Sequence, residues 1–186
     1  MPEEHRDEVP QKKWRRDLFF ILKTCIIAFV IMLLLNQYVF NLTVVKGQSM
    51  LPTLANQERM FIDKVVYYFY APQHGEIVVL KDPTSKDKNN SFLVKRIIGV
   101  PGDQVEIKNH KLYVNNEIVN EPYTDVQIED EDMPLIKLQV GEFFVMGDNR
   151  HAGKSKDSRY FGSVQREDIV GRAEFIIWPI YTIRSL

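Results

Sequence analysis

The chain has 186 residues, 24 of them basic and 25 acidic, and its net charge of −1 gives no electrostatic reason to expect nucleic acid as a partner. Its single cysteine, Cys25, excludes an internal disulfide and a cysteine-based zinc site. If one stretch lies in a membrane, roughly 145 residues remain, which is the size of one ordinary domain.

The first predicted element is a membrane-spanning helix over residues 18–40, which follows a short, charged tail at 1–17 that we expect to be disordered. About 20 apolar residues cross a hydrocarbon core of about 30 Å. The only charge in this segment, Lys23, lies near its N-terminal end, where the ammonium can reach the interface. A buried core helix is the alternative, but residues 26–35 show no polar stripe.

The flanking charges predict the orientation of this helix. One basic residue, Lys46, follows it closely, whereas four precede it directly: Lys12, Lys13, Arg15 and Arg16. The positive-inside rule therefore predicts a single-pass protein of the cell membrane, with a cytoplasmic N-terminus and residues 41–186 outside. A cleaved secretory signal is the rival, but residues 36–40 (NQYVF) offer no small residues for cleavage.

Residues 41–186 show mostly short strand signals, which predict one mainly β domain with an antiparallel sheet or partly open barrel. Asn109-His110 and Asn115-Asn116 predict tight hairpins. Helical signals are limited to residues 63–69 and to a turn at 166–169. The predicted strands lie at 42–46, 76–80, 91–100, 105–107, 111–114, 117–119, 142–146 and 173–178.

Two polar segments interrupt the strand pattern. Residues 81–90 (KDPTSKDKNN) and the acidic residues 126–134 (VQIEDEDMP) contain proline and many charges. Both are therefore predicted to be solvated surface loops.

The sequence excludes several common protease mechanisms. It contains no His-Glu-x-x-His pair and no Gly-x-Ser-x-Gly elbow, and Cys25 falls in the predicted membrane span. A lysine can serve as the base instead, if burial lowers its pKa. Lys95 suits this role, because in a strand it shares a face with Leu93 and Ile97 while Arg96 points the other way.

Three segments resemble the motifs of bacterial type I signal peptidases, in particular their single-span Gram-positive form. Residues 47–54 (GQSMLPTL) are similar to the nucleophile motif of that family, and residues 95–103 (KRIIGVPGD) to its lysine motif. Residues 147–150 (GDNR), followed by 157–162 (DSRYFG), resemble its last motif. The order, the spacings and the single N-terminal anchor agree with the family from about Leu18 onwards.

The resemblance implies a role for each matching residue. Ser49 would be the nucleophile, with its backbone N–H in the oxyanion hole, and Lys95 the general base. Ser155 would orient the lysine. The implied supporting ion pairs are Asp148 with Arg96 and Asp157 with Arg159, and the implied substrate pocket consists of Val45, Leu93 and Val94. No cofactor or metal is implied.

The chain departs from the family pattern at two positions. Gly47 stands where some members supply a second oxyanion-hole hydroxyl, so this donor is absent. Residues 151–154 form a longer connection before Ser155 than the usual pattern has.

The resemblance also implies the substrate. Ser49 lies at most about 30 Å from Phe40 along an extended chain, so the active site would be held near the outer membrane surface. Signal peptides of exported preproteins, themselves bound in the lipid bilayer close to the secretion translocon, would meet it there and be cleaved after an Ala-x-Ala pattern. Three alternatives remain: an inactive preprotein-binding relative, a self-cleaving repressor, which would need a DNA-binding N-terminus, and a specialised maturation protease for one partner.

Overall fold

The computed structural model of the protein describes residues 11–87 and 91–186; within its first helix, it describes the side chains of residues 14–35. The chain divides into two compact units that meet between Val39 and Phe40. The first unit contains one long helix and the second contains all of the strands.

Helix α1 (Gln11–Tyr38) forms the first unit. Its segment Trp14–Leu35 is long and apolar enough to cross a membrane, and none of it is buried against protein. The helix begins at Gln11, so the prediction of a disordered tail was wrong for residues 11–17, where neither glycine nor proline interrupts the helix. Residues 1–10 of the predicted tail lie outside the described residues.

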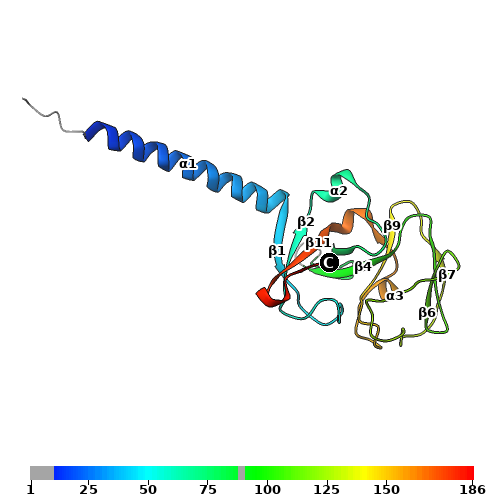
Figure 1. Cartoon of the computed structure of the whole chain (residues 1–186). Helices are drawn as coiled ribbons and strands as arrows, with labels where there is room; N and C mark the ends of the chain where they lie inside the picture. The colour runs from blue at the N-terminus through cyan, green and yellow to red at the C-terminus, as the bar shows by residue number, and fades with distance from the viewer. Residues whose placement is uncertain (1–10, 88–90) are drawn as a thin grey trace, which may run out of the picture. The chain divides into compact units, whose positions relative to one another are not determined.

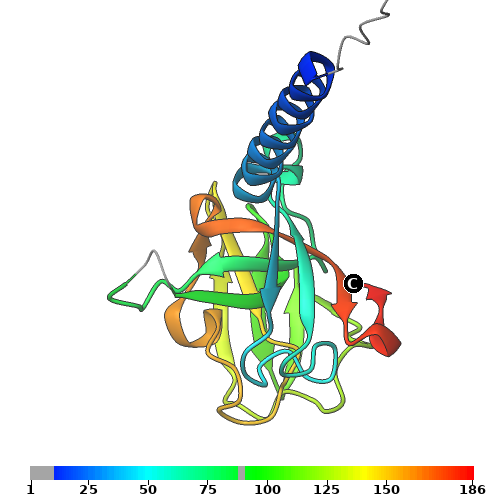
Figure 2. The same ribbon diagram turned by 90° about the vertical axis from the view of Figure 1, so that its left-hand side faces the viewer.

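An eight-stranded antiparallel sheet forms most of the second unit, with the strand order β1-β2-β11-β3-β4-β9-β10 and with β12 paired to β11. The sheet curls strongly, as Figures 1 and 2 show, and this confirms the predicted mainly β fold with a partly open barrel. Its strands are β1 (Phe40–Val44), β2 (Arg59–Asp63), β3 (Ile77–Lys81), β4 (Phe92–Gly99), β9 (Glu142–Met146), β10 (Val164–Gln165), β11 (Ile169–Trp178) and β12 (Arg184–Ser185).

A smaller antiparallel sheet has the order β7-β6-β5-β8. Asn109 and His110 have φ of 51° and 63°, and Asn115 and Asn116 have φ of 54° and 67°, so both predicted tight turns are confirmed. Asparagine tolerates this left-handed backbone better than most residues. The strands are β5 (Gln104–Lys108), β6 (Lys111–Val114), β7 (Glu117–Ile118) and β8 (Met133–Lys137).

The described helices of the second unit are short. The predicted helix at 63–69 was wrong in its first half, because Asp63 ends β2 and its carboxylate accepts hydrogen bonds from the N–H groups of Val65 and Val66. One helical turn follows. The turns are α2 (Val66–Phe69), α3 (Ser158–Phe161), the 3₁₀ turn η1 (Arg166–Asp168), which confirms the turn predicted near 166–169, and the 3₁₀ turn η2 (Ile180–Thr182).

Sequence patterns missed four strands, namely β2, β8, β10 and β12. Pro134 lies within β8, and a proline in a local pattern predicts a loop. Because β8 is an edge strand of the smaller sheet, its proline removes no ladder hydrogen bond that the sheet needs. The strand predicted at 142–146 matches β9.

Strand β4 lies where three apolar clusters meet. Val94 packs against the cluster around Met60 and Ile176, whereas Leu93 and Ile97 belong to the cluster around Val145. Ile98 joins a third cluster between the two sheets. Because close-packed surroundings of this kind leave a strand little freedom, the residues of β4 are held in fixed positions.

Candidate active site

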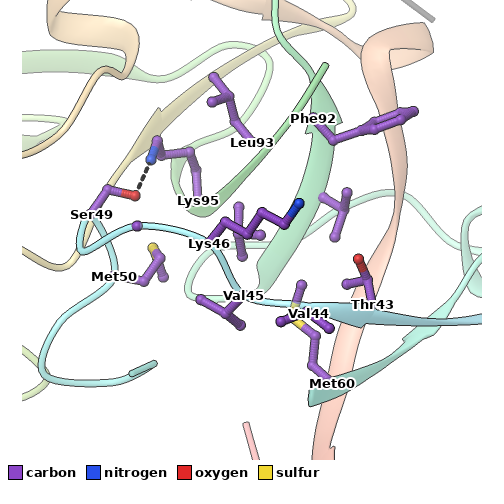
Figure 3. A pocket seen from close by; sticks show the side chains of 13 residues that line it. Thr43, Val44, Val45, Lys46, Ser49, Met50, Met60, Phe92, Leu93 and Lys95 are labelled. Carbon is purple, nitrogen blue, oxygen red and sulfur yellow. Dashed lines mark hydrogen bonds between the residues drawn. The ribbon is translucent and has the colours of Figure 1, made fainter. Parts of the chain in front are cut away.

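The side chains of Ser49 and Lys95 meet at the mouth of a cleft. Lys95 Nζ lies 2.6 Å from Ser49 Oγ, within hydrogen-bond distance (Figure 3). Ser49 belongs to the loop that follows β1, and Lys95 lies in β4 opposite Val78 of β3. The loop and the strand are 46 residues apart in the chain. An ammonium would donate this hydrogen bond to the hydroxyl oxygen, whereas a neutral amine could also accept a hydrogen bond from the hydroxyl.

Lys95 is almost completely buried, with 1% of its surface exposed. Burial lowers the pKa of Lys95 from its ordinary value of 10.5 to about 8, because the charged ammonium loses its hydration. The negative charge of Asp157 opposes this shift, and the positive charge of Arg159 supports it. A substantial fraction of the amine is therefore uncharged at mildly alkaline pH.

Asp157 and Arg159 form a buried ion pair beside Lys95. Arg159 Nε and Nη2 donate to the two carboxylate oxygens at 2.9 and 2.7 Å, and the N–H of Gly147 donates to the same carboxylate at 3.0 Å. Burial alone would raise the pKa of Asp157, but the hydrogen bonds and charge of Arg159 outweigh it and lower that pKa. The carboxylate is thus kept ionised, and its negative charge limits how far burial lowers the pKa of Lys95.

Asp148 joins the segment that carries Ser49 to the strand that carries Lys95. Its carboxylate accepts hydrogen bonds from Arg96 Nε and Nη2 at 2.9 and 2.6 Å and from Thr53 Oγ1 at 2.5 Å. Arg96 also donates to the carbonyl oxygen of Gly75, and its guanidinium lies 4.0 Å above the ring of Tyr123. A bidentate pair of this kind fixes orientation as well as distance. Both ion pairs implied by the resemblance are therefore present.

Asn149 fixes the backbone of the nucleophile, a role that sequence reasoning missed. Its backbone N–H donates to the carbonyl oxygen of Ser49 at 3.0 Å, and its side-chain amide donates to that of Gln48 at 2.9 Å. Asn149 lies within the last motif, between Asp148 and Arg150. Its position was therefore visible in the sequence, but nothing in the local pattern indicates which carbonyl groups it contacts.

Arg150 is a second residue that the sequence analysis did not single out. Its side chain is fully buried, donates from Nε to the carbonyl oxygen of Gly147, and forms a bidentate pair with Glu121 at 2.9 and 2.5 Å. This ion pair links Arg150 of the last motif to Glu121, which lies in the loop between β7 and β8. Glu121 lies outside all three motifs, so no local pattern indicates that it pairs with Arg150.

The acidic segment at 126–134 is more than a solvated surface loop, so that prediction was wrong. Glu129 accepts hydrogen bonds from the N–H of Ala152 and pairs with His151, and Asp130 accepts from the N–H of Gly153. Asp130 also pairs with Arg159 at 2.6 Å. The long connection at 151–154 is therefore held by carboxylates that its local sequence does not reveal.

Ser155 lies next to Gly147 and close to the nucleophile. Its Oγ is buried, and no hydrogen bond joins it to Lys95 Nζ. A Cβ at position 147 would overlap both Ser155 Oγ and the carbonyl oxygen of Ser49, which explains the need for glycine there. The orienting role of Ser155 stays a prediction.

A cleft of about 320 Å³ opens beside Ser49 and Lys95 (Figure 3). All three residues predicted for the substrate pocket, Val45, Leu93 and Val94, line it. Residues 43–47 form one wall and residues 92–95 of β4 the other. Such a cleft suits an extended chain, whose backbone would pass between the two walls.

The arrangement has the parts that acyl transfer requires. A hydroxyl lies beside an amine of lowered pKa, and the backbone N–H of Ser49 makes no hydrogen bond within the described residues. In the same part of the chain, no group of three or more His, Cys, Asp or Glu side chains could hold a metal ion. The chemistry that this geometry supports is hydrolysis through a serine nucleophile.

Comparison with known families gives a match over most of the chain. The family described as "Signal peptidase, peptidase S26" matches residues 18–178. This range includes the helix from Leu18 onwards and nearly all of the β-rich unit.

Several curated proteins are similar over nearly their whole length. Signal peptidase I P of Bacillus subtilis subsp. natto is 38% identical over 173 residues, which cover 88% of this chain and 90% of that protein. Signal peptidase I S of Bacillus subtilis strain 168 is 38% identical over 174 residues, with the same coverage. Signal peptidase IB of Staphylococcus aureus is 34% identical over 182 residues, 89% of this chain and 92% of that protein.

A solved structure is also similar. The crystal structure of a signal peptidase I from Enterococcus faecalis V583 matches with a TM-score of 0.46 and 30% sequence identity, and covers 55% of this chain and 97% of that one.

The buried amine generates a prediction about stability. Because the folded state lowers the pKa of Lys95, the unfolded chain binds more protons between about pH 8 and 10.5, and wild-type stability rises with pH across that window. Lys95→Met removes the cost of burying the ammonium and should stabilise the protein by about 1–3 kcal/mol at pH 7, and by less at pH 10. Thermal unfolding of the full chain in detergent at both pH values measures this.

The matched control is Lys111→Met, an exposed lysine of β6, which should change stability little at either pH. A Lys95→Met variant that is less stable than wild type at pH 7 would mean that the ammonium is well accommodated in the folded state.

Proposed function

Since the chain belongs to the peptidase S26 family of signal peptidases, we propose that it removes signal peptides from exported preproteins, with Ser49 as nucleophile and Lys95 as general base. It is a hydrolase, a serine endopeptidase of that family. The observation that carries the proposal is the 2.6 Å approach of a buried lysine amine to a serine hydroxyl at the mouth of a cleft.

In the first step, the uncharged Lys95 amine takes the proton from Ser49 Oγ as that oxygen attacks the scissile carbonyl carbon. The tetrahedral intermediate collapses when the Lys95 ammonium gives this proton to the leaving amine. The signal peptide then remains as an ester on Ser49. Lys95 next removes a proton from water, the water attacks the ester, and the returned proton restores the Ser49 hydroxyl.

The negative charge on the substrate oxygen needs a donor that is already in place. The backbone N–H of Ser49 fills this role, and the hydrogen bonds from Asn149 to the carbonyl oxygens of Ser49 and Gln48 support its orientation. Gly47 supplies no side-chain donor. The second donor is therefore a backbone group or a water molecule.

Four charged residues support the pair of Ser49 and Lys95. Asp148 and Arg96 fix the distance between the serine loop and β4, because Asp148 bonds to both segments. Asp157 and Arg159 act on the amine through their charges, in opposite directions. Ser155 completes this set as a residue that orients Lys95 when substrate is bound.

The substrate binds as an extended strand along the cleft. Within the large sheet β1 is an edge strand, and β9 pairs with β4 only from Arg96 onwards, so backbone groups on both walls have no partner strand. Val45, Leu93 and Val94 would contact the side chains just before the scissile bond. Aliphatic side chains at these three positions would favour small, uncharged side chains there, which agrees with cleavage after an Ala-x-Ala pattern.

Helix α1 anchors the enzyme in the lipid bilayer. Basic residues precede its apolar segment, which favours a cytoplasmic N-terminus and an extracytoplasmic catalytic domain. The β-rich unit starts at Phe40, immediately after the anchor. A preprotein held in the same bilayer near the translocon would therefore reach the cleft at high effective concentration.

Removal of either member of the pair should abolish cleavage. Ser49→Ala removes the nucleophile, and Lys95→Arg replaces the base with a group that does not deprotonate. Each should lower kcat/KM for a preprotein in detergent at least about a thousandfold. Lys108→Arg, in the smaller sheet, is the control and should keep full activity. Substantial turnover by either active-site variant would disprove the dyad.

Activity should rise with pH as Lys95 loses its proton. With a pKa of about 8, only about a tenth of the amine is neutral at pH 7, and most of it is neutral at pH 9. We therefore expect kcat/KM to rise about tenfold between these values and then level off. A profile that is flat above pH 7 would point to a group with the pKa of histidine.

The orientation can be tested on intact cells. Protease added outside should digest the β-rich unit, while a tag placed before Met1 stays protected until the membrane is permeabilised. The opposite pattern, with an accessible tag and a protected β-rich unit, would reverse the proposed topology.

A further inference from the structure

The proposed substrate cleft has an uneven distribution of charge. Of the residues that line it, Lys46 and Lys95 are basic and none is acidic. Lys95 must be uncharged to act as a base, so Lys46 carries the lasting charge. A charge on the wall of the cleft acts on a bound peptide at short range, where the effective dielectric constant near a protein surface is lower than that of bulk water.

Lys46 occupies a position from which it can contact a substrate. It follows β1 and precedes Ser49 by three residues, in the wall that also contains Val45. Its side chain is exposed and forms no ion pair with any residue that the structure describes. Figure 3 shows its ammonium over the cleft, between the segment that carries Val45 and the strand that carries Phe92.

We propose that Lys46 is a specificity-determining residue that selects signal peptides by charge. Its ammonium favours an acidic side chain shortly before the scissile bond and disfavours a lysine or arginine there. This inference rests on the proposed function, because it assumes that the cleft binds the peptide to be cut.

The length of the Lys46 side chain limits which substrate positions its ammonium can contact. Its Cα lies within about 10 Å of that of Ser49 along an extended chain, and its side chain adds about 6 Å. A bound strand advances about 3.3 Å per residue, so the affected positions lie within about five residues of the scissile bond. Small side chains are required at the first and third of these, which leaves the second, fourth and fifth.

The expected effect is moderate. By Coulomb's law, two unit charges about 6 Å apart change an equilibrium by about threefold in bulk water and by about a hundredfold near a protein surface, and salt screens the interaction. At low ionic strength we expect about a tenfold higher kcat/KM for a peptide with glutamate at the sensitive position than for the same peptide with lysine. At about 0.5 M salt, most of this preference should disappear.

The test uses the full chain in detergent and peptides spanning one preprotein cleavage site. Glutamate, glutamine or lysine is placed in turn at the second, fourth and fifth positions before the bond. Wild type should prefer glutamate at one or more of these positions. Lys46→Gln should remove the preference, Lys46→Glu should reverse it, and Lys46→Arg should retain it. Lys108→Gln removes one exposed positive charge from the smaller sheet and should behave as wild type.

Two results would overturn the proposal. The first is a wild-type enzyme that cleaves all charge variants equally. The second is a preference that survives unchanged in Lys46→Glu. Cleavage of the glutamine peptide by wild type reports separately on the proposed function: if that peptide is not cut at all, the peptidase assignment of the cleft fails, and the role of Lys46 fails with it.

Discussion

The structure depends on the burial of one amine beside one hydroxyl. A lysine in water is an ammonium and cannot take a proton from serine, so Lys95 must be withdrawn from solvent to become a base. The fold provides this by placing it in β4, where three apolar clusters meet. Asp157 counteracts part of the shift, and its charge keeps the pKa of Lys95 at about 8 rather than lower. The site is thus a balance between desolvation and nearby charge.

The second requirement is that the serine loop and the lysine strand stay in register, and the last motif supplies it. Asp148 bonds to Thr53 on one side and to Arg96 on the other, while Asn149 holds the carbonyl groups around the nucleophile. Three segments that are distant in the chain are therefore joined within a few ångströms of the reacting atoms. Binding energy from an extended substrate would act on a site that is already assembled.

Much of this could be predicted from local sequence, and the physical reason is clear. Alternation along β4 indicates which side of the strand Lys95 faces, and asparagine pairs indicate left-handed turns, because both features depend on a few neighbouring residues. Contacts between remote segments could not be predicted. The pairs Glu121–Arg150 and Asp130–Arg159 each join residues 29 apart. Asp130 lies in the acidic segment 126–134, whose local sequence predicts a solvated loop. Strand β8 was not predicted, because Pro134 favours a loop in a local pattern. Proline is tolerated in an edge strand such as β8, but the position of a strand in the sheet is not visible in the sequence.

The proposed mechanism depends on the ionisation state of Lys95, which can be measured without substrate. Heteronuclear NMR of the chain with ¹³C-labelled lysine side chains, in detergent, would follow each ε-carbon with pH, and the Lys95 signal is identified by its absence from Lys95→Arg. We expect the Lys95 signal to titrate near pH 8, well below the ordinary lysine pKa of 10.5. A Lys95 signal that titrates near the ordinary value of 10.5 would contradict the proposed mechanism.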